Sequence, residues 1–220
     1  MIVDIKKLKK TFLDGSKKLH VLKDINLQID KGSIVTIKGP SGSGKSTLLS
    51  IIGTLDNADS GELIINGISI KENINIDKLR NKSIGFVFQF HNLISELTLH
   101  ENVSLPRMIA KEQLNKEELI ELFEYFDLKH RMNSFPNDLS GGEKQRVAVM
   151  RAIINNPSII IADEPTGNLD KENALKMMSL FQKLNTEKKL TIIIATHDEH
   201  IFNIGHKKYQ LAEGTLKLVH

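Results

Sequence analysis

The sequence predicts a single α/β domain with a mainly parallel sheet, an antiparallel β edge and a helical lobe. Three observations lead to this expectation. Apolar strand-like segments alternate with helical ones, which is the order of a parallel sheet covered by helices. The N-terminal residues, up to about residue 29, read as strands without a helix between them. From about residue 93 to residue 137 the pattern becomes helical.

The first half of the chain is predicted to be mostly β structure. Residues 62–70 read as a hairpin, because Asn66-Gly67 favours a type I′ turn. Strands are expected at 2–8, 21–29, 33–37 and 84–89, with a polar loop around 14–18.

The second half is predicted to be mixed. Residues 116–126 place apolar side chains on one helix face, and residues 170–188 also read as a helix. Strands are expected at 158–162 and 190–195, with a final hairpin over 208–219. The sheet core would then comprise about 1–90 and 156–220, and the helical lobe about 91–155.

Composition excludes several classes of protein. The chain has 220 residues, 40% of them hydrophobic and 26% charged, as in an ordinary globular domain. Its net charge of +3 is too small to predict nucleic-acid binding, and none is expected. The absence of cysteine excludes disulfides and thiolate metal sites. Neither a signal peptide nor an apolar run of about 18 residues is found, so no direct membrane insertion is expected.

One nine-residue segment carries the clearest chemistry. A predicted strand runs into it and a predicted helix leaves it, as in a phosphate-binding loop. Glycines let the backbone N–H groups curl around phosphate oxygens at a positive helix end. The lysine adds charge at the β- and γ-phosphates, and the serine after it can ligate Mg²⁺. The alternative is a Gly/Ser turn that binds nothing. The segment is Gly39, Pro40, Ser41, Gly42, Ser43, Gly44, Lys45, Ser46 and Thr47.

A second pattern is an apolar strand that ends in two carboxylates, Asp163 and Glu164. Alone, such a pair is more often a solvated strand end. When a phosphate-binding loop lies earlier in the chain, as here, Asp163 occupies the position of the aspartate that associates with Mg²⁺ in P-loop NTPases. Glu164 can then polarise an attacking water as a general base.

A third pattern is Ser140-Gly141-Gly142 before a helix that runs to about residue 155. Ser140 can cap this helix, and the glycines permit close backbone approach. The segment is therefore a candidate second anion site, aimed at a terminal phosphate. The alternative is an ordinary serine-capped helix.

These patterns resemble those of the ATP-binding cassette (ABC) ATPases, a family of P-loop NTPases. Residues 139–146 match the signature segment of the family, and residues 168–170 match its D-loop. Gln89 matches the Q-loop glutamine and His197 the switch histidine. Phe12 stands where the family places an aromatic residue for adenine, although tyrosine is commoner there. The elements occur in family order over essentially the whole chain.

The resemblance implies a function and partners. ATP and Mg²⁺ would be the ligands. Ser46, Gln89 and Asp163 would lie near the metal, and His197 would contact the γ-phosphate. Two copies would pair head to tail as a homodimer, and Ser140, Gly141 and Gly142 of one copy would complete the site of the other. Membrane transporter subunits would be the further partners, so the chain would sit peripherally on the cytoplasmic side of the inner membrane.

Within the family, residues 163–170 resemble the branch that holds lipoprotein-releasing, macrolide-export and cell-division ATPases. The segments at 89–93 and 97–103 resemble the lipoprotein-releasing ATPases most. No fused membrane domain is expected. One alternative is the ATPase of a macrolide or peptide exporter or of a cell-division ABC complex. Others are a soluble ABC protein of translation or DNA repair, an ATP sensor without useful turnover, and a small-molecule P-loop kinase.

One segment is predicted to receive the membrane partner. Residues 89–106 begin at the Q-loop glutamine, Gln89, and are rich in apolar residues. Exposed members of this run would form a docking patch, and buried members would belong to the core of the helical lobe. The candidates are Phe90, His91, Leu93, Ile94, Leu97 and Leu99.

Overall fold

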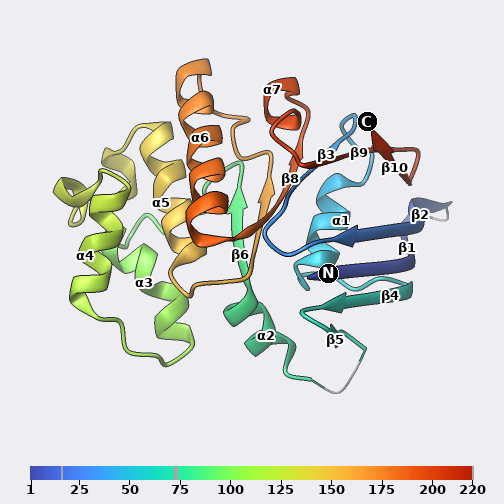
Figure 1. Ribbon diagram of the computed structural model, residues 1–220, viewed down its shortest axis with the longest axis horizontal. Helices are drawn as coiled ribbons and strands as arrows, with labels where there is room; N and C mark the ends of the chain where they lie inside the picture. The colour runs from blue at the N-terminus through green and yellow to red at the C-terminus, as the bar shows by residue number, and fades with distance from the viewer. Residues whose placement is uncertain (16, 72–73, 220) are drawn as a thin grey trace.

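The computed structural model describes residues 1–15, 17–71 and 74–219 (Figure 1). Its central feature is a six-stranded sheet with the order β10-β9-β3-β8-β7-β6. Every neighbouring pair is parallel except β9 and β10, which form the final hairpin. The strands are β3 (Ile34–Lys38), β6 (Ile84–Phe88), β7 (Ile159–Asp163), β8 (Thr191–Thr196), β9 (Lys207–Ala212) and β10 (Thr215–Val219). The mainly parallel sheet is thus confirmed.

The N-terminal strands form a second, antiparallel sheet rather than an edge of the first. Its order is β2-β1-β4-β5. The strands are β1 (Val3–Asp14), β2 (Lys17–Ile29), β4 (Ser60–Ile65) and β5 (Ile68–Ser69). The expected loop around 14–18 is wrong in the part that the structure describes, because β1 and β2 pair as far as Asp14 and Lys17. Residue 16 lies outside the described residues. The turn between β4 and β5 has positive φ angles at Asn66 (52°) and Gly67 (77°), as a type I′ turn requires.

Helices cover both faces of the parallel sheet. They are α1 (Lys45–Ile52), α2 (Ile76–Ser83), α3 (Leu99–Ile109), α4 (Lys116–Tyr125), α5 (Gly141–Ile153), α6 (Lys171–Lys188) and α7 (Glu199–Phe202). Two short 3₁₀ turns, η1 (Lys129–Arg131) and η2 (Pro136–Asp138), precede α5. The short helices α2 and α7 have no counterpart in the sequence prediction.

Alternate residues of the parallel strands supply two hydrophobic cores. In β7, Ile159 and Ile161 pack with α1 and the antiparallel sheet, whereas Ile160 and Ala162 pack with α3 to α6. Because successive strand residues point to opposite faces, a strand buried on both faces reads as a continuous apolar run. The parallel sheet therefore separates the two cores, with α1 on one side and the longer helices on the other (Figure 1).

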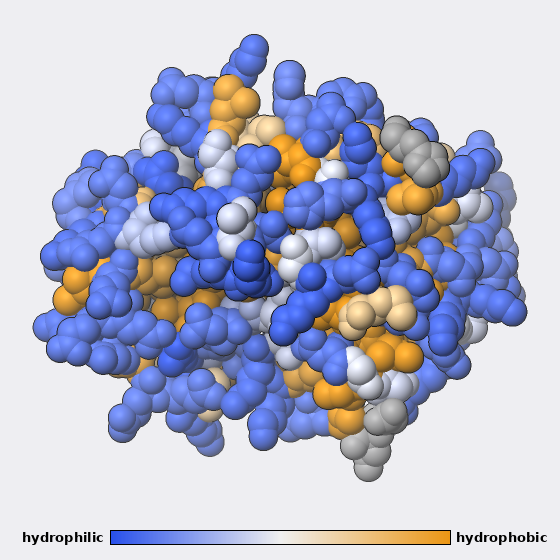
Figure 2. Space-filling model, in the orientation of Figure 1, coloured by the Kyte–Doolittle hydropathy of each residue, from blue (hydrophilic) through white to orange (hydrophobic). Residues whose placement is uncertain are grey.

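Between residues 91 and 155 the structure contains helices and irregular segments but no strand. These helices lie together at one end of the molecule (Figure 1). The surface is mainly hydrophilic on the face drawn in Figure 2, with hydrophobic residues in small groups among the hydrophilic ones. No helix within the described ranges is both long enough and apolar enough to span a bilayer.

Candidate functional site

The candidate site residues follow the carboxyl ends of four neighbouring strands. Lys38 of β3 lies opposite Thr196 of β8, Ala195 lies opposite Asp163 of β7, and Asp163 lies opposite Phe88 of β6. The residues that come next along the chain, Gly39, His197, Glu164 and Gln89, therefore emerge side by side at one sheet edge. In parallel α/β sheets this edge is where ligands bind.

The loop from Gly39 to Gly44 connects β3 to α1. Gly42 and Gly44 have φ angles of 76° and 99°, which side chains other than glycine rarely adopt. A Cβ atom on Gly39 would lie 2.2 Å from the backbone oxygen of Leu211. The N-terminus of α1 has no side-chain cap and no acidic residue in its first turn. Its N–H groups and dipole are thus available to an anion.

Lys45 lies inside this loop. Its Nζ donates hydrogen bonds to the backbone oxygens of Gly39 (2.8 Å) and Pro40 (3.1 Å), and lies 3.9 Å from Glu164 Oε1. Only 8% of the side chain is exposed. The ammonium group is therefore held at the centre of the loop, where phosphate oxygens can replace the backbone acceptors.

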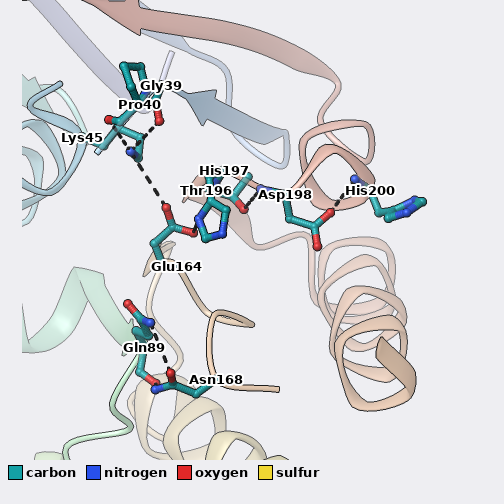
Figure 3. Close-up of polar contacts among 10 residues, drawn as sticks. All are labelled: Gly39, Pro40, Lys45, Gln89, Glu164, Asn168, Thr196, His197, Asp198 and His200. Atoms are coloured by element: carbon teal, nitrogen blue, oxygen red, sulfur yellow. Dashed lines mark hydrogen bonds and ion pairs between the residues drawn. The ribbon is translucent and has the colours of Figure 1, made fainter. Parts of the chain in front are cut away.

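Glu164 and His197 are brought together, as Figure 3 shows. Glu164 Oε2 lies 2.9 Å from His197 Nδ1 and accepts a hydrogen bond from the His197 backbone N–H at 3.3 Å. Glu164 has a φ angle of 47°, an uncommon conformation for a residue with a side chain. Its own N–H donates to Ala195 O at 2.9 Å, which fixes this turn beside β8. The glutamate is mostly buried and the histidine mostly exposed.

Asp163 is half-buried at the end of β7. Its Oδ1 is buried without a hydrogen-bond partner in the described structure. Burial raises the pKa of this carboxyl group, and the Ser46 hydroxyl and Lys45 oppose the shift. Asp163 and Ser46 line one small pocket with Leu49 and Phe88. An orphaned carboxylate oxygen beside a serine hydroxyl is a fitting place for a hard cation or its water ligands.

This donor set suits Mg²⁺ held mainly by a nucleotide. No cluster of three or more His, Asp or Glu side chains that could hold a metal occurs in the part of the chain that the structure describes. Mg²⁺ usually keeps several waters and binds through one or two protein oxygens plus substrate phosphates. Ser46, Gln89 and Asp163 supply oxygens of that kind.

Gln89 follows β6 and points to the turn after Glu164 (Figure 3). Its Nε2 donates to Asn168 Oδ1 at 3.3 Å, and Asn168 Nδ2 donates to the Gln89 backbone oxygen at 3.1 Å. The sequence places Asn168 in the D-loop motif but does not predict that it pairs with Gln89.

Phe12 lies on the β1–β2 hairpin and is 41% exposed. Lys10 Nζ lies 5.0 Å from the centre of its ring. The hairpin contacts the phosphate-binding loop, since a Cβ atom on Gly44 would lie 2.9 Å from Val21 Cγ1 of β2. An exposed ring on a strand pair that abuts the loop is a suitable platform for an adenine base.

Ser140, Gly141 and Gly142 lie at the start of α5. Ser140 Oγ donates to Glu143 Oε2 at 2.7 Å, and the two residues form a capping box. These hydrogen bonds hold the pKa of the Glu143 carboxyl below its usual value. A Cβ atom on Gly142 would lie 2.6 Å from Asn173 Oδ1, so this glycine packs within the chain. No hydrogen bond in the described structure joins residues 140–142 to residues 39–47.

Gln145 lies in the matched signature segment, but sequence reasoning assigned it no role of its own. Its side chain is fully buried on α5, and its Nε2 donates to the backbone oxygen of Phe88 at 3.3 Å. Phe88 is the residue that precedes Gln89. The signal of Gln145 in the sequence is a glutamine on the apolar face of the helix, four residues before the buried Val149.

Comparison with known proteins decides the family. The family model described as ABC transporter matches residues 22–167. This chain belongs to the ABC transporter family. The ATPase is 47% identical over 203 residues to the lipoprotein-releasing system ATP-binding protein LolD of Bacteroides thetaiotaomicron, covering 90% of this chain and 93% of the relative. Identity to the LolD protein of Treponema denticola is 44%, over 99% of this chain and 98% of the relative.

Solved structures give the same result for the fold. The ABC ATPase matches the dimeric structure of MJ0796, a bacterial ABC transporter cassette, with a TM-score of 0.89 and 41% identity. The match covers 98% of this chain and 96% of that one. A second MJ0796 structure, described as a post-hydrolysis state bound to ADP and Pi, matches at 40% identity and the same TM-score of 0.89, covering 99% of both chains. The predicted P-loop NTPase fold of ABC type is confirmed, and the chain is an ATPase of this family.

Proposed function

We propose that this chain is the ATP-hydrolysing subunit of a lipoprotein-releasing ABC transporter. The observation that carries the proposal is the 47% identity to the LolD protein of Bacteroides thetaiotaomicron over 90% of the chain. The local geometry supports ATP hydrolysis, since the uncapped start of α1, Lys45 and Glu164 lie at one sheet edge.

Each residue at this edge has a proposed role. The backbone of the loop and Lys45 bind the β- and γ-phosphates, and Phe12 stacks on the adenine. Bound Mg²⁺ would neutralise phosphate charge. Ser46, Gln89 and Asp163 would hold it. Glu164 takes a proton from the attacking water, and His197, which pairs with Glu164 at 2.9 Å, orients that carboxylate and contacts the γ-phosphate.

We propose that the active unit is a homodimer. In the described structure, Ser140, Gly141 and Gly142 share no hydrogen bond with the phosphate-binding loop of their own chain, which leaves them available to the γ-phosphate of a second copy. The MJ0796 cassette, to which this chain is similar, is described as dimeric. The chain would consist of a RecA-like core, about residues 1–90 and 156–220, and a helical lobe of about residues 91–155.

The partners would be integral membrane transporter subunits, and the ATPase would lie peripherally on the cytoplasmic side of the inner membrane. Phe90 and Ile94 support a docking role for the segment after Gln89, because they are 73% and 42% exposed. Leu99, another candidate, is fully buried and belongs to the core of the helical lobe. Leu99 therefore follows the alternative for this run, as a buried member of the lobe core and not of the docking patch.

Two measurements test the proposal. Glu164→Gln keeps the shape of the side chain but removes the base, so ATP turnover falls by about 10²–10⁴ while ATP binding persists. With ATP and Mg²⁺ the variant accumulates as a dimer in size-exclusion chromatography. Hydrolysis at the wild-type rate would remove Glu164 from the mechanism.

Co-purification from native membranes tests the transport role. Wild-type ATPase is expected to bring down integral membrane subunits together with lipoprotein. Recovery with subunits that carry a drug, a peptide or cell-division proteins instead would contradict lipoprotein release.

A further inference from the structure

The side chain of Gln89 donates a hydrogen bond to the turn that follows Glu164, from Nε2 to Asn168 Oδ1 at 3.3 Å. This turn is itself fixed, because Gly167 N–H donates to Glu164 O and Leu169 N–H donates to Thr166 O, both at 3.0 Å. Thr166 is buried, which anchors the turn in the protein. The turn therefore presents Gly167 and Asn168 to Gln89 as a rigid surface.

Gly167 provides the space for the Gln89 side chain. A Cβ atom on Gly167 would lie 2.7 Å from Gln89 Nε2 and 3.0 Å from its Cδ. Contacts this short do not occur between real Cβ atoms and their neighbours, so any side chain at position 167 displaces the amide. The backbone of Gly167 has no positive φ angle, and alanine can adopt its conformation.

Asn168 decides which atom of the Gln89 amide faces the turn. Its Nδ2 donates to the Gln89 backbone oxygen at 3.1 Å, so its Oδ1 is the atom left for the Gln89 side chain. An oxygen of this kind only accepts hydrogen bonds, and it therefore selects Nε2, at 3.3 Å, over Oε1. The Gln89 oxygen is directed away from Asn168 (Figure 3).

The backbone beneath this amide is fixed from two sides. The carbonyl of Phe88 accepts a hydrogen bond from the buried Gln145 of α5 at 3.3 Å. The next carbonyl, that of Gln89, accepts from Asn168. Two successive carbonyl groups are thus held by side-chain amides from the helix and from the turn, which fixes the backbone from which the Gln89 side chain extends.

We propose that Gly167 and Asn168 are positioning residues that present the Gln89 amide oxygen, rather than its nitrogen, to Mg²⁺. Mg²⁺ is ligated by oxygen and demands near-ideal geometry, so a rotated amide offers it no ligand. Residues that hydrogen-bond to a metal ligand commonly set its orientation in this way. The inference rests on the proposed function, in which Gln89 is near the metal.

The test measures metal-dependent nucleotide binding, not turnover. Isothermal titration calorimetry with a non-hydrolysable ATP analogue gives the affinity of the full chain in Mg²⁺ and in EDTA. The ratio of the affinity in Mg²⁺ to the affinity in EDTA is the gain that Mg²⁺ provides. Gly167→Ala and Asn168→Ala are each expected to reduce this gain about tenfold, the lower end of the range for residues that orient metal ligands. The affinity in EDTA should stay within about twofold of the wild-type value, because the hydrogen bonds of both residues in the described structure go to Gln89 and Glu164 and not to the phosphate-binding loop.

A double-mutant comparison separates positioning through Gln89 from other roles. Gln89→Ala alone should remove the same share of the gain, and adding Gly167→Ala or Asn168→Ala to it should change nothing further. Asn203→Ala is the matched control, because Asn203 is an exposed asparagine at the end of α7 that makes no side-chain hydrogen bond in the described structure. It should leave the gain unchanged.

Two results would overturn the inference alone. One is an unchanged gain in Gly167→Ala and Asn168→Ala while Gln89→Ala reduces it. The other is a further loss when either change is added to Gln89→Ala, which would mean that the turn acts on something else. If wild type gains nothing from Mg²⁺, or Gln89→Ala has no effect, the metal role of Gln89 in the proposed function fails, and this inference fails with it.

Discussion

At the scale of single residues, Lys45 shows how the protein prepares for a phosphate. Its ammonium donates to two backbone oxygens of its own loop, and both bonds must give way to stronger charge-assisted contacts when phosphate binds. Lys45→Ala is therefore expected to weaken ATP binding by about 2–4 kcal/mol, as measured by calorimetry. Lys207→Ala, which removes an exposed lysine that pairs with Asp30, should not change the affinity. Wild-type affinity in Lys45→Ala would contradict the phosphate site.

Asp163 shows the opposite situation, a group whose surroundings are unfavourable until a ligand arrives. Because burial raises its pKa, its contribution to stability is full below the unfolded-state pKa and is lost as pH rises through the folded-state pKa. At neutral pH the ionised carboxylate therefore destabilises the ligand-free chain. Asp163→Asn should raise the free energy of unfolding by about 1 kcal/mol, since it removes a half-buried charge that lies near the carboxylate of Glu164.

Urea denaturation at neutral pH measures this change, and calorimetry with the ATP analogue should show a smaller gain from Mg²⁺ in the same variant. Asp170→Asn is the comparison. Hydrogen bonds from the backbone and side chain of Asn173 lower the pKa of Asp170, so its replacement should not raise stability. A drop in stability in Asp163→Asn would show that the ionised carboxylate is well accommodated.

The motifs made the individual residues predictable, but not the contacts between motifs. Lys45, Asp163, Glu164 and His197 each stand at a fixed place in a local pattern. The pairing of Gln89 with Asn168 joins residues 79 positions apart, and the burial of Gln145 depends on how α5 packs on β6. Such contacts follow from strand order and register, which a local sequence pattern does not contain.

At the scale of elements, the main difference between the prediction and the structure lies at the tip of the β1–β2 hairpin. A loop is expected around 14–18 because the residues there are polar, so the alternation of apolar and polar residues that indicates a half-buried strand is missing. The strands exist because they pair with each other as far as Asp14 and Lys17. The extension has a consequence for the site, because it places Phe12 within β1.

This placement makes the adenine platform testable. Phe12→Ala is expected to weaken ATP binding by about 0.5–1.5 kcal/mol, the scale of one aromatic stack, and Phe12→Tyr should be nearly neutral. Leu13→Ala is the matched control, because the next residue of a strand points to the other face and Leu13 is 75% exposed. Calorimetry compares the three variants with wild type. Equal losses in Phe12→Ala and Leu13→Ala would assign the effect to the hairpin and not to the ring.

At the scale of the whole molecule, the strand order brings four motifs to one sheet edge, while the signature residues at the start of α5 have no hydrogen bond to that edge. In the proposed function, a second copy completes the site with its signature residues, and a membrane subunit couples the ATPase to transport. The segment after Gln89 is suited to the second task. It begins at the residue proposed to contact Mg²⁺ and then exposes Phe90 and Ile94.

Placing a charge on this segment should separate docking from folding. Phe90→Glu should leave the folded state and ATP binding intact, because the side chain is 73% exposed, but the membrane subunits should no longer co-purify. Leu99→Glu should unfold the chain, since it buries a charge at a position with no exposure. Leu175→Glu, on α6 and 48% exposed, is the control for an exposed apolar residue elsewhere and should retain the partner. Circular dichroism melting reports folding, and affinity purification from membranes reports assembly. If Phe90→Glu and Leu175→Glu retain the membrane subunits equally, docking occurs on another surface.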